Sequence, residues 1–128
     1  MSMLNKITGI AAAAIISLIE RTEYTSASEV YSKSNKLVGY KNNKILIADE
    51  CLIRLYSIVE ENAPRSSGNC EITTVSKDGD ITGSMIIRVE VDDFGCGFRS
   101  PSVSTSDVIV DRINDNAEAI INALKSVI

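Results

Sequence analysis

The sequence contains no histidine and no tryptophan, and it has only two phenylalanines and four tyrosines among 128 residues. Without an imidazole the chain has no Ser–His or Cys–His nucleophile pair, no histidine metal ligand and no histidine proton shuttle. The few aromatic rings also leave little surface on which nucleic-acid bases can stack. The composition therefore predicts a non-catalytic protein that carries no cofactor and no metal site.

Cysteine is scarce as well, and its spacing is uninformative for metal binding. The three cysteines, Cys51, Cys70 and Cys96, form no CxxC pair. An odd number of unpatterned cysteines is typical of reduced thiols in a cytoplasmic protein rather than of a disulfide framework. A single bridge between Cys70 and Cys96 is the alternative that the sequence leaves open.

The charge of the chain is moderate and unevenly distributed. The net charge is −4, with 45% hydrophobic and 23% charged residues, which is ordinary for one globular domain spanning residues 1–128. Residues 1–48 contain six basic and three acidic residues, whereas residues 49–128 contain seven basic and fourteen acidic residues. DNA binding needs clustered positive charge, so the acidic part argues against DNA as a partner.

The first apolar run, residues 7–19, follows Lys6 and is too short to span a bilayer. We interpret it as a structural helix of a cytoplasmic protein. The alternative is a secretory signal within residues 1–27, whose removal would make the protein secreted.

This first helix is apolar around almost its whole circumference. A helix of that kind must be covered inside the domain or at a subunit interface. We expect its apolar stripe to form an interface with a second copy. The residues of this stripe are Leu4, Ile7, Ala11, Ala14, Ile15 and Leu18.

Two elements are predicted between residues 36 and 62. Asn42 and Asn43 tolerate the positive φ of a tight turn, so residues 36–41 and 44–48 are predicted to form a β-hairpin. Asp49 is predicted to cap a helix over residues 50–62, because a side-chain oxygen there can accept a hydrogen bond from the first turn. The buried stripe of that helix would consist of Leu52, Leu55, Tyr56 and Val59.

The remaining sequence predicts a second hairpin and a final helix. Residues 70–76 and 81–91 alternate between apolar and polar around a turn at residues 77–80, where Gly79 supplies a permissive backbone. Apolar residues at helical spacing then run from Ile109 to Ile128. The predicted fold is α+β, an antiparallel sheet from two β-hairpins with three helices in the order α-ββ-α-ββ-α.

The most unusual local sequence is the glycine-rich segment around Cys96. Glycines on both sides of a thiol let a ligand or a second backbone approach closely, and the following serines lead into a helix N-terminus that can hold a phosphate. The candidate ligand-binding residues are Cys96, Gly97, Arg99, Ser100 and Ser102. The alternative is a strand end that packs Phe94 and Phe98 into the core.

One basic patch stands out, formed by Lys33, Lys36, Lys41 and Lys44. It is a candidate contact for RNA, a phosphorylated ligand or an acidic partner. Lysines on an edge strand that prevent aggregation explain the same pattern.

These observations lead to two functional hypotheses. The first is a non-catalytic protein-interaction module, an adaptor, chaperone or inhibitor that acts as a homodimer on another protein. The second is a small-ligand or nucleotide sensor that uses residues 94–102. No nucleotide-binding glycine motif supports the second hypothesis.

Overall fold

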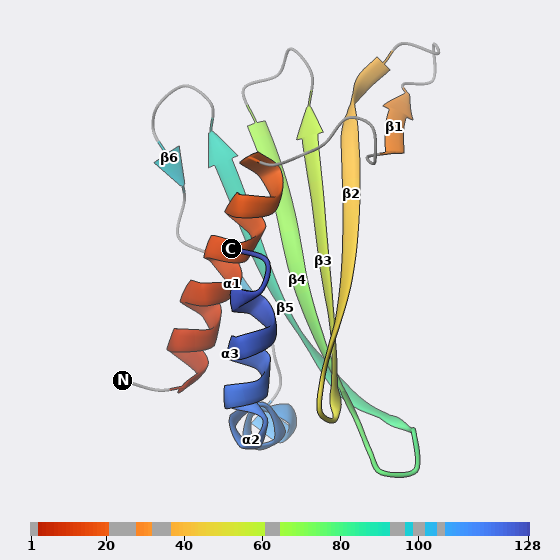
Figure 1. The fold of residues 1–128 in the computed structure, drawn as a ribbon, viewed down its shortest axis with the longest axis vertical. Helices are drawn as coiled ribbons and strands as arrows, with labels where there is room; N and C mark the ends of the chain where they lie inside the picture. The colour runs from red at the N-terminus through yellow and green to blue at the C-terminus, as the bar shows by residue number, and fades with distance from the viewer. Residues whose placement is uncertain are drawn as a thin grey trace.

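The computed structural model describes residues 3–20, 28–31, 37–60, 65–92, 97–98, 102–104 and 107–128. In this part of the chain one helix is followed by strands of a single antiparallel sheet and then by two helices (Figure 1). The elements are α1 (Met3–Glu20), β1 (Ser28–Tyr31), β2 (Leu37–Ala48), β3 (Cys51–Glu60), β4 (Arg65–Val75), β5 (Ile81–Asp92), β6 (Gly97–Phe98), β7 (Ser102–Ser104), α2 (Asp107–Asp115) and α3 (Ala117–Lys125).

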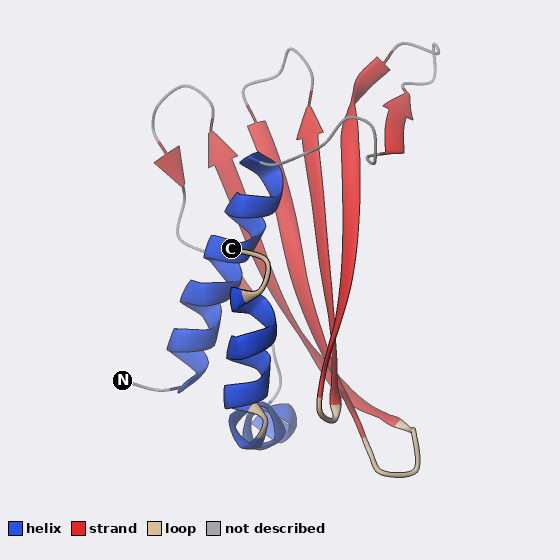
Figure 2. Cartoon of the chain, viewed as in Figure 1, coloured by secondary structure: helices blue, strands red, loops and turns tan. Residues whose placement is uncertain are grey.

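The sheet is a meander in which each strand from β1 to β5 pairs with the next one along the chain. Its main part consists of the long strands β2 to β5 (Figure 2). The short strands β6 and β7 both pair with β5. Phe98 of β6 pairs with Val91, and Val103 of β7 pairs with Ile87. They share one edge of the sheet, while β1 lies at the other.

The structure confirms the α+β class, the antiparallel sheet and the presence of three helices. The second hairpin is β4 and β5, with Gly79 at a φ of +88° in the turn between them. The predicted terminal helix is present in two parts, α2 and α3, separated at Asn116. At this break the Asn116 side chain donates a hydrogen bond of 2.8 Å to the Arg112 carbonyl. A side chain that bonds to its own backbone in this way competes with the regular helix.

The predicted first hairpin is wrong, because Asn42 and Asn43 lie in the interior of the continuous strand β2. The turn comes later, at Asp49 and Glu50, where Ala48 pairs directly with Cys51 across the two strands. Asp49 has a φ of +53°, the left-handed conformation that Asp adopts more readily than most residues. Asp49 is therefore a turn residue and not a helix cap.

The predicted helix over residues 50–62 is also wrong, since Cys51–Glu60 forms strand β3. The predicted order α-ββ-α-ββ-α fails at this point. Burial follows the strand period of two. Ile53 and Leu55 are fully buried, whereas the side chain of Leu52 lies on the other face of β3 and is 41% exposed. Apolar residues occur on both faces of this strand, so helical spacing could be traced through them equally well.

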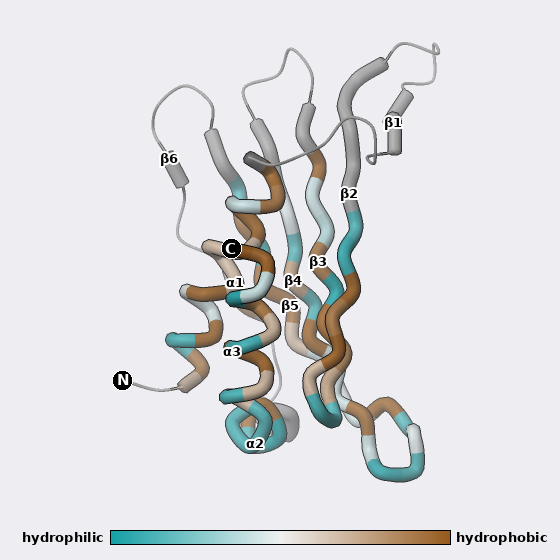
Figure 3. The backbone as a smooth tube through the Cα atoms, viewed as in Figure 1, coloured by the Kyte–Doolittle hydropathy of each residue, from teal (hydrophilic) through white to brown (hydrophobic). Residues whose placement is uncertain are grey.

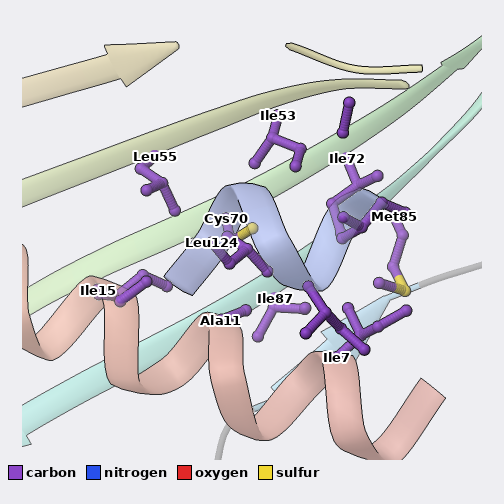
Figure 4. Close-up of a cluster of buried hydrophobic side chains, with 14 of the residues drawn as sticks. Ile7, Ala11, Ile15, Ile53, Leu55, Cys70, Ile72, Met85, Ile87 and Leu124 are labelled. Atoms are coloured by element: carbon purple, nitrogen blue, oxygen red, sulfur yellow. The ribbon is translucent and has the colours of Figure 1, made fainter. Parts of the chain in front are cut away.

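The core lies between the helices and one face of the sheet. The helix α1 lies beside α3, and both pack on the strands (Figure 1). Figure 4 shows apolar side chains of α1 and Leu124 of α3 facing those of β3, β4 and β5. The fully buried members include Ile7, Ile15, Ile53, Leu55, Ile72, Met85, Ile87, Ile113, Ile120 and Leu124.

The predicted interface stripe of α1 packs against the core of the same chain. Ile7, Ala11, Ala14 and Ile15 are completely buried against the sheet and the C-terminal helices, while Leu4 and Leu18 are half-buried against the same core. The four buried side chains leave no surface for a second copy, whereas Leu4 and Leu18 remain partly exposed. Of the two ways to cover an apolar helix, the fold uses the intramolecular one.

Candidate functional site

The face of the sheet opposite α1 and α3, which we call the open face, carries no described helix. Because side chains alternate along a strand, the residues between the buried ones point to this face. None of the open-face side chains that the structure describes is buried. They are Asn43, Ile45 and Ile47 of β2, Leu52, Arg54, Tyr56 and Ile58 of β3, Ser67, Asn69, Glu71, Thr73 and Val75 of β4, and Ser84, Ile86, Arg88 and Glu90 of β5.

Ile45, Ile47 and Leu52 form a contiguous exposed cluster on the open face, which we call the apolar patch. Their exposed fractions are 64%, 79% and 41%, and Ile47 pairs directly with Leu52 across β2 and β3. Figure 3 shows the strongly hydrophobic stretch of β2 beside that of β3, near the turn that joins them. Apolar clusters at the surface mark sites of association more often than isolated apolar residues do.

The polar part of the open face lies next to the apolar patch. Arg54 donates hydrogen bonds of 3.3 Å from Nε and from a terminal nitrogen to the Asn43 side-chain oxygen. Arg88 lies 3.4 Å from a Glu90 carboxylate oxygen. Among the open-face side chains that the structure describes, two arginines and two glutamates thus balance, whereas the whole chain has a net charge of −4.

A shallow hollow of about 160 Å³ lies in the middle of the open face. Its walls are Arg54, Tyr56, Asn69 and Glu71. Arginine and tyrosine are the residue types most often found at the energetically dominant positions of protein interfaces. The hollow is therefore suited to receive a side chain of a partner.

The predicted ligand loop is not assembled into a site by the described residues. Cys96, Arg99 and Ser100 lie outside them. Gly97 of β6 pairs with Asp92 of β5, and Ser102 of β7 pairs with Arg88 of β5. The backbone at both positions thus extends the edge of the sheet beside β5.

The predicted basic patch is described only in part. Lys33 and Lys36 lie outside the described residues, and of Lys41 only the strand position in β2 is described. Lys44 is an exposed residue of β2, beyond the segment that pairs with β1. A lysine at such a strand edge agrees with a role in preventing edge-to-edge aggregation.

The two described cysteines are free thiols in the core. Cys70 is fully buried and unpaired with any other cysteine, so the alternative of a Cys70–Cys96 bridge is absent from the structure. Burial raises the pKa of Cys70 to about 12 from its ordinary value near 9. Burial, followed by the charges of Asp49 and Glu50, raises the pKa of Cys51 to about 11. Neither thiol has the lowered pKa of a reactive cysteine.

These raised pKa values predict a loss of stability in alkali. Unfolded thiols ionise near pH 9 but the folded ones only near pH 11 and 12, so the contribution to stability is complete below pH 9 and is lost as the pH rises through this window. We expect a decline of up to about 1.4 kcal/mol per pH unit for each thiol. Unfolding by urea at pH 8, 9 and 10 measures this slope.

The matched control is the double variant Cys51→Ala/Cys70→Ala, which keeps all other titrating groups. Its stability should fall less steeply between pH 8 and 10 than that of the natural chain. Equal slopes in the two proteins would contradict the assignment of both thiols to the core.

Sequence reasoning missed the apolar patch, although a signal for it exists. Ile45 and Ile47 alternate with Leu46 and Ala48, which is the period of a strand with apolar residues on both faces.

Among the described helices none is long and apolar enough to cross a membrane. In the same part of the chain, no group of three or more cysteine, aspartate or glutamate side chains is arranged to hold a metal ion. Comparison with protein-family models, with curated proteins and with solved structures finds no match to this chain.

Proposed function

We propose that the chain is a non-catalytic protein-interaction module whose open face binds a second copy of the same chain. The observation that carries this proposal is the apolar patch of Ile45, Ile47 and Leu52 on a sheet face that no described helix covers. Burying an exposed isoleucine contributes about 1.5–3 kcal/mol, so three adjacent side chains supply a driving force for association. The homodimer would act as an adaptor, chaperone or inhibitor of another protein.

The charges of the open face favour a second copy as the occupant. In a twofold dimer the same surface meets itself, and it must therefore be self-complementary. The two arginines and two glutamates that the structure describes on this face allow each positive group to meet a negative group of the other copy. A partner of one dominant charge gains nothing from a face with this balance, while two net-negative chains approach most easily where the local charge is zero.

The size of the face sets the expected strength of the dimer. The four strands β2 to β5 are 10–12 residues long, and at about 4.8 Å between strands they cover roughly 700 Å² of sheet. Stable complexes bury about 800 Å² on each partner. We therefore expect a reversible dimer with the two sheets stacked about 10 Å apart, in which Ile47 packs near the hollow beside Tyr56.

Sedimentation velocity over a range of concentrations tests this proposal. The natural chain should change from monomer to dimer as its concentration rises. The variant Ile47→Asp should raise the dissociation constant by about 100-fold or more, because a twofold axis makes each substitution count twice. Its thermal stability as a monomer should stay the same, since the Ile47 side chain is 79% exposed.

The matched control is Ile128→Asp, which introduces the same charge at a half-exposed isoleucine at the end of the C-terminal helical region. This variant should dimerise like the natural chain. A natural chain that stays monomeric at every concentration, or two variants that weaken the dimer equally, would refute the open face as the homodimer interface.

A further inference from the structure

A second surface feature is independent of the open face. Two turns and a helix junction surround a polar cleft of about 640 Å³: the β2–β3 turn, the β4–β5 turn and the break between α2 and α3. This volume lies in the range of small-molecule sites. Five ionisable side chains line the polar cleft: Asp49, Glu50, Lys77, Arg112 and Asp115.

Backbone hydrogen bonds hold the walls of the polar cleft in place. The Val75 amide donates to the Glu50 carbonyl at 2.8 Å, which joins the β2–β3 turn to the end of β4. The Ser76 amide donates to the Asp80 carbonyl at 2.8 Å and closes the β4–β5 turn. On the third wall, the Asn116 side chain is bonded to the α2 backbone. These bonds fix the backbone of the three elements from which the charged side chains extend, which reduces the backbone entropy lost on binding.

Arg112 is oriented by a chain of hydroxyl groups. Its guanidinium donates a hydrogen bond of 3.2 Å to the Thr82 hydroxyl. That hydroxyl lies 2.6 Å from the hydroxyl of Thr74, whose side chain is 1% exposed. A guanidinium has five N–H donors in a planar fork, so this contact fixes its direction and leaves donors for an anionic group.

The cleft carries both charges, and its own charges do not neutralise one another. Lys77 and Arg112 make no ion pair with a carboxylate among the described residues, although Asp49, Glu50 and Asp115 line the same space. A purely anionic ligand would be repelled by these three carboxylates. A purely cationic ligand would be repelled by the lysine and the arginine. A molecule that carries both charges can place each of them beside an opposite charge of the cleft.

We propose that the polar cleft binds a small zwitterion of the amino-acid or short-peptide class. The ligand carboxylate binds Arg112 and Lys77. The ligand ammonium binds the carboxylates of Asp49, Glu50 and Asp115, with Ser76 and Asn116 as neutral polar contacts. Charge-assisted hydrogen bonds at both ends of the ligand give the site its selectivity.

Titration of the isotope-labelled full chain with glycylglycine, followed by backbone amide NMR, tests this site. Chemical shifts at Glu50, Lys77, Arg112 and Asn116 should change and reach saturation. N-acetylglycylglycine lacks the ammonium and glycylglycinamide lacks the carboxylate, and each should bind at least about tenfold more weakly. Equal binding of the acetylated probe would overturn the proposal in favour of an anion site. Equal binding of the amide would overturn it in favour of a cation site.

Two variants that each remove one positive charge locate the binding. Arg112→Gln should weaken glycylglycine binding by about tenfold or more, because it removes the charge that meets the carboxylate. Lys125→Gln removes an exposed positive charge at the end of α3 that does not line the polar cleft, and it should leave the titration unchanged. If no probe produces saturating shifts, the polar cleft does not bind a zwitterion and the proposal fails. The sedimentation result for the open face is unaffected by either outcome.

Discussion

Replacing Ile53 by alanine is expected to lower the free energy of unfolding by about 2–5 kcal/mol. The Ile53 side chain is fully buried, and its truncation leaves a cavity in the aliphatic core between the helices and the sheet. A domain of this size is stabilised by only about 5–15 kcal/mol, so the loss is a large share of the total. Urea unfolding of the variant measures it.

Leu52 supplies the comparison that distinguishes a strand from a helix. In the helix that the sequence predicts, Leu52 belongs to the buried stripe and Ile53 does not. In β3 the roles are reversed, because Leu52 points to the open face and is 41% exposed. We expect Leu52→Ala to cost less than about 1 kcal/mol at monomer concentrations. A larger cost for Leu52→Ala than for Ile53→Ala would contradict the strand.

Replacing Gly68 by alanine is expected to lower the free energy of unfolding by about 1–3 kcal/mol. Gly68 lies in β4 where α1 crosses the sheet. A β-carbon at this position would lie 2.7 Å from the carbonyl oxygen of Tyr56 and still closer to the Cγ2 methyl of Ile15. Both neighbours are packed, so either the helix or the strand must move. Thermal or urea unfolding detects the change.

Two further variants separate this steric effect from the general effect of removing a glycine. Gly9 lies in α1 with open space around it, so Gly9→Ala should raise stability by about 0.5–1 kcal/mol. Ile15→Ala removes the methyl group that meets residue 68, so the double variant Ile15→Ala/Gly68→Ala should lose less than the sum of the two single losses. Strict additivity would show that α1 does not approach β4 at Gly68.

The parts of the fold that the sequence predicts correctly are those in which one period is unambiguous. The first helix repeats apolar residues at helical spacing from Leu4 to Leu18, and the C-terminal helices repeat theirs every three to four residues from Ile113 to Leu124. In β5 the residues Met85, Ile87 and Val89 are buried and alternate with exposed ones, and Gly79 marks the preceding turn. Local pattern and tertiary environment agree at these positions.

The candidate sites were less accessible to sequence reasoning. The apolar patch depends on the pairing of Ile47 with Leu52, which becomes visible only when the turn is placed at Asp49 instead of Asn42. The polar cleft combines residues 49–50, 76–77 and 112–116, which no local motif connects. Residue type alone cannot show which distant turns meet.

The sequence by itself determined that the chain has no histidine chemistry, that its core is aliphatic, and that α1, the second hairpin and the C-terminal helices form where they do. Only the tertiary structure decided whether residues 51–60 form a helix or a strand and which side of α1 is covered. The physical reason is the same in both cases. A segment that is apolar on more than one side fits several local structures, and its neighbours select the one that buries the most apolar surface.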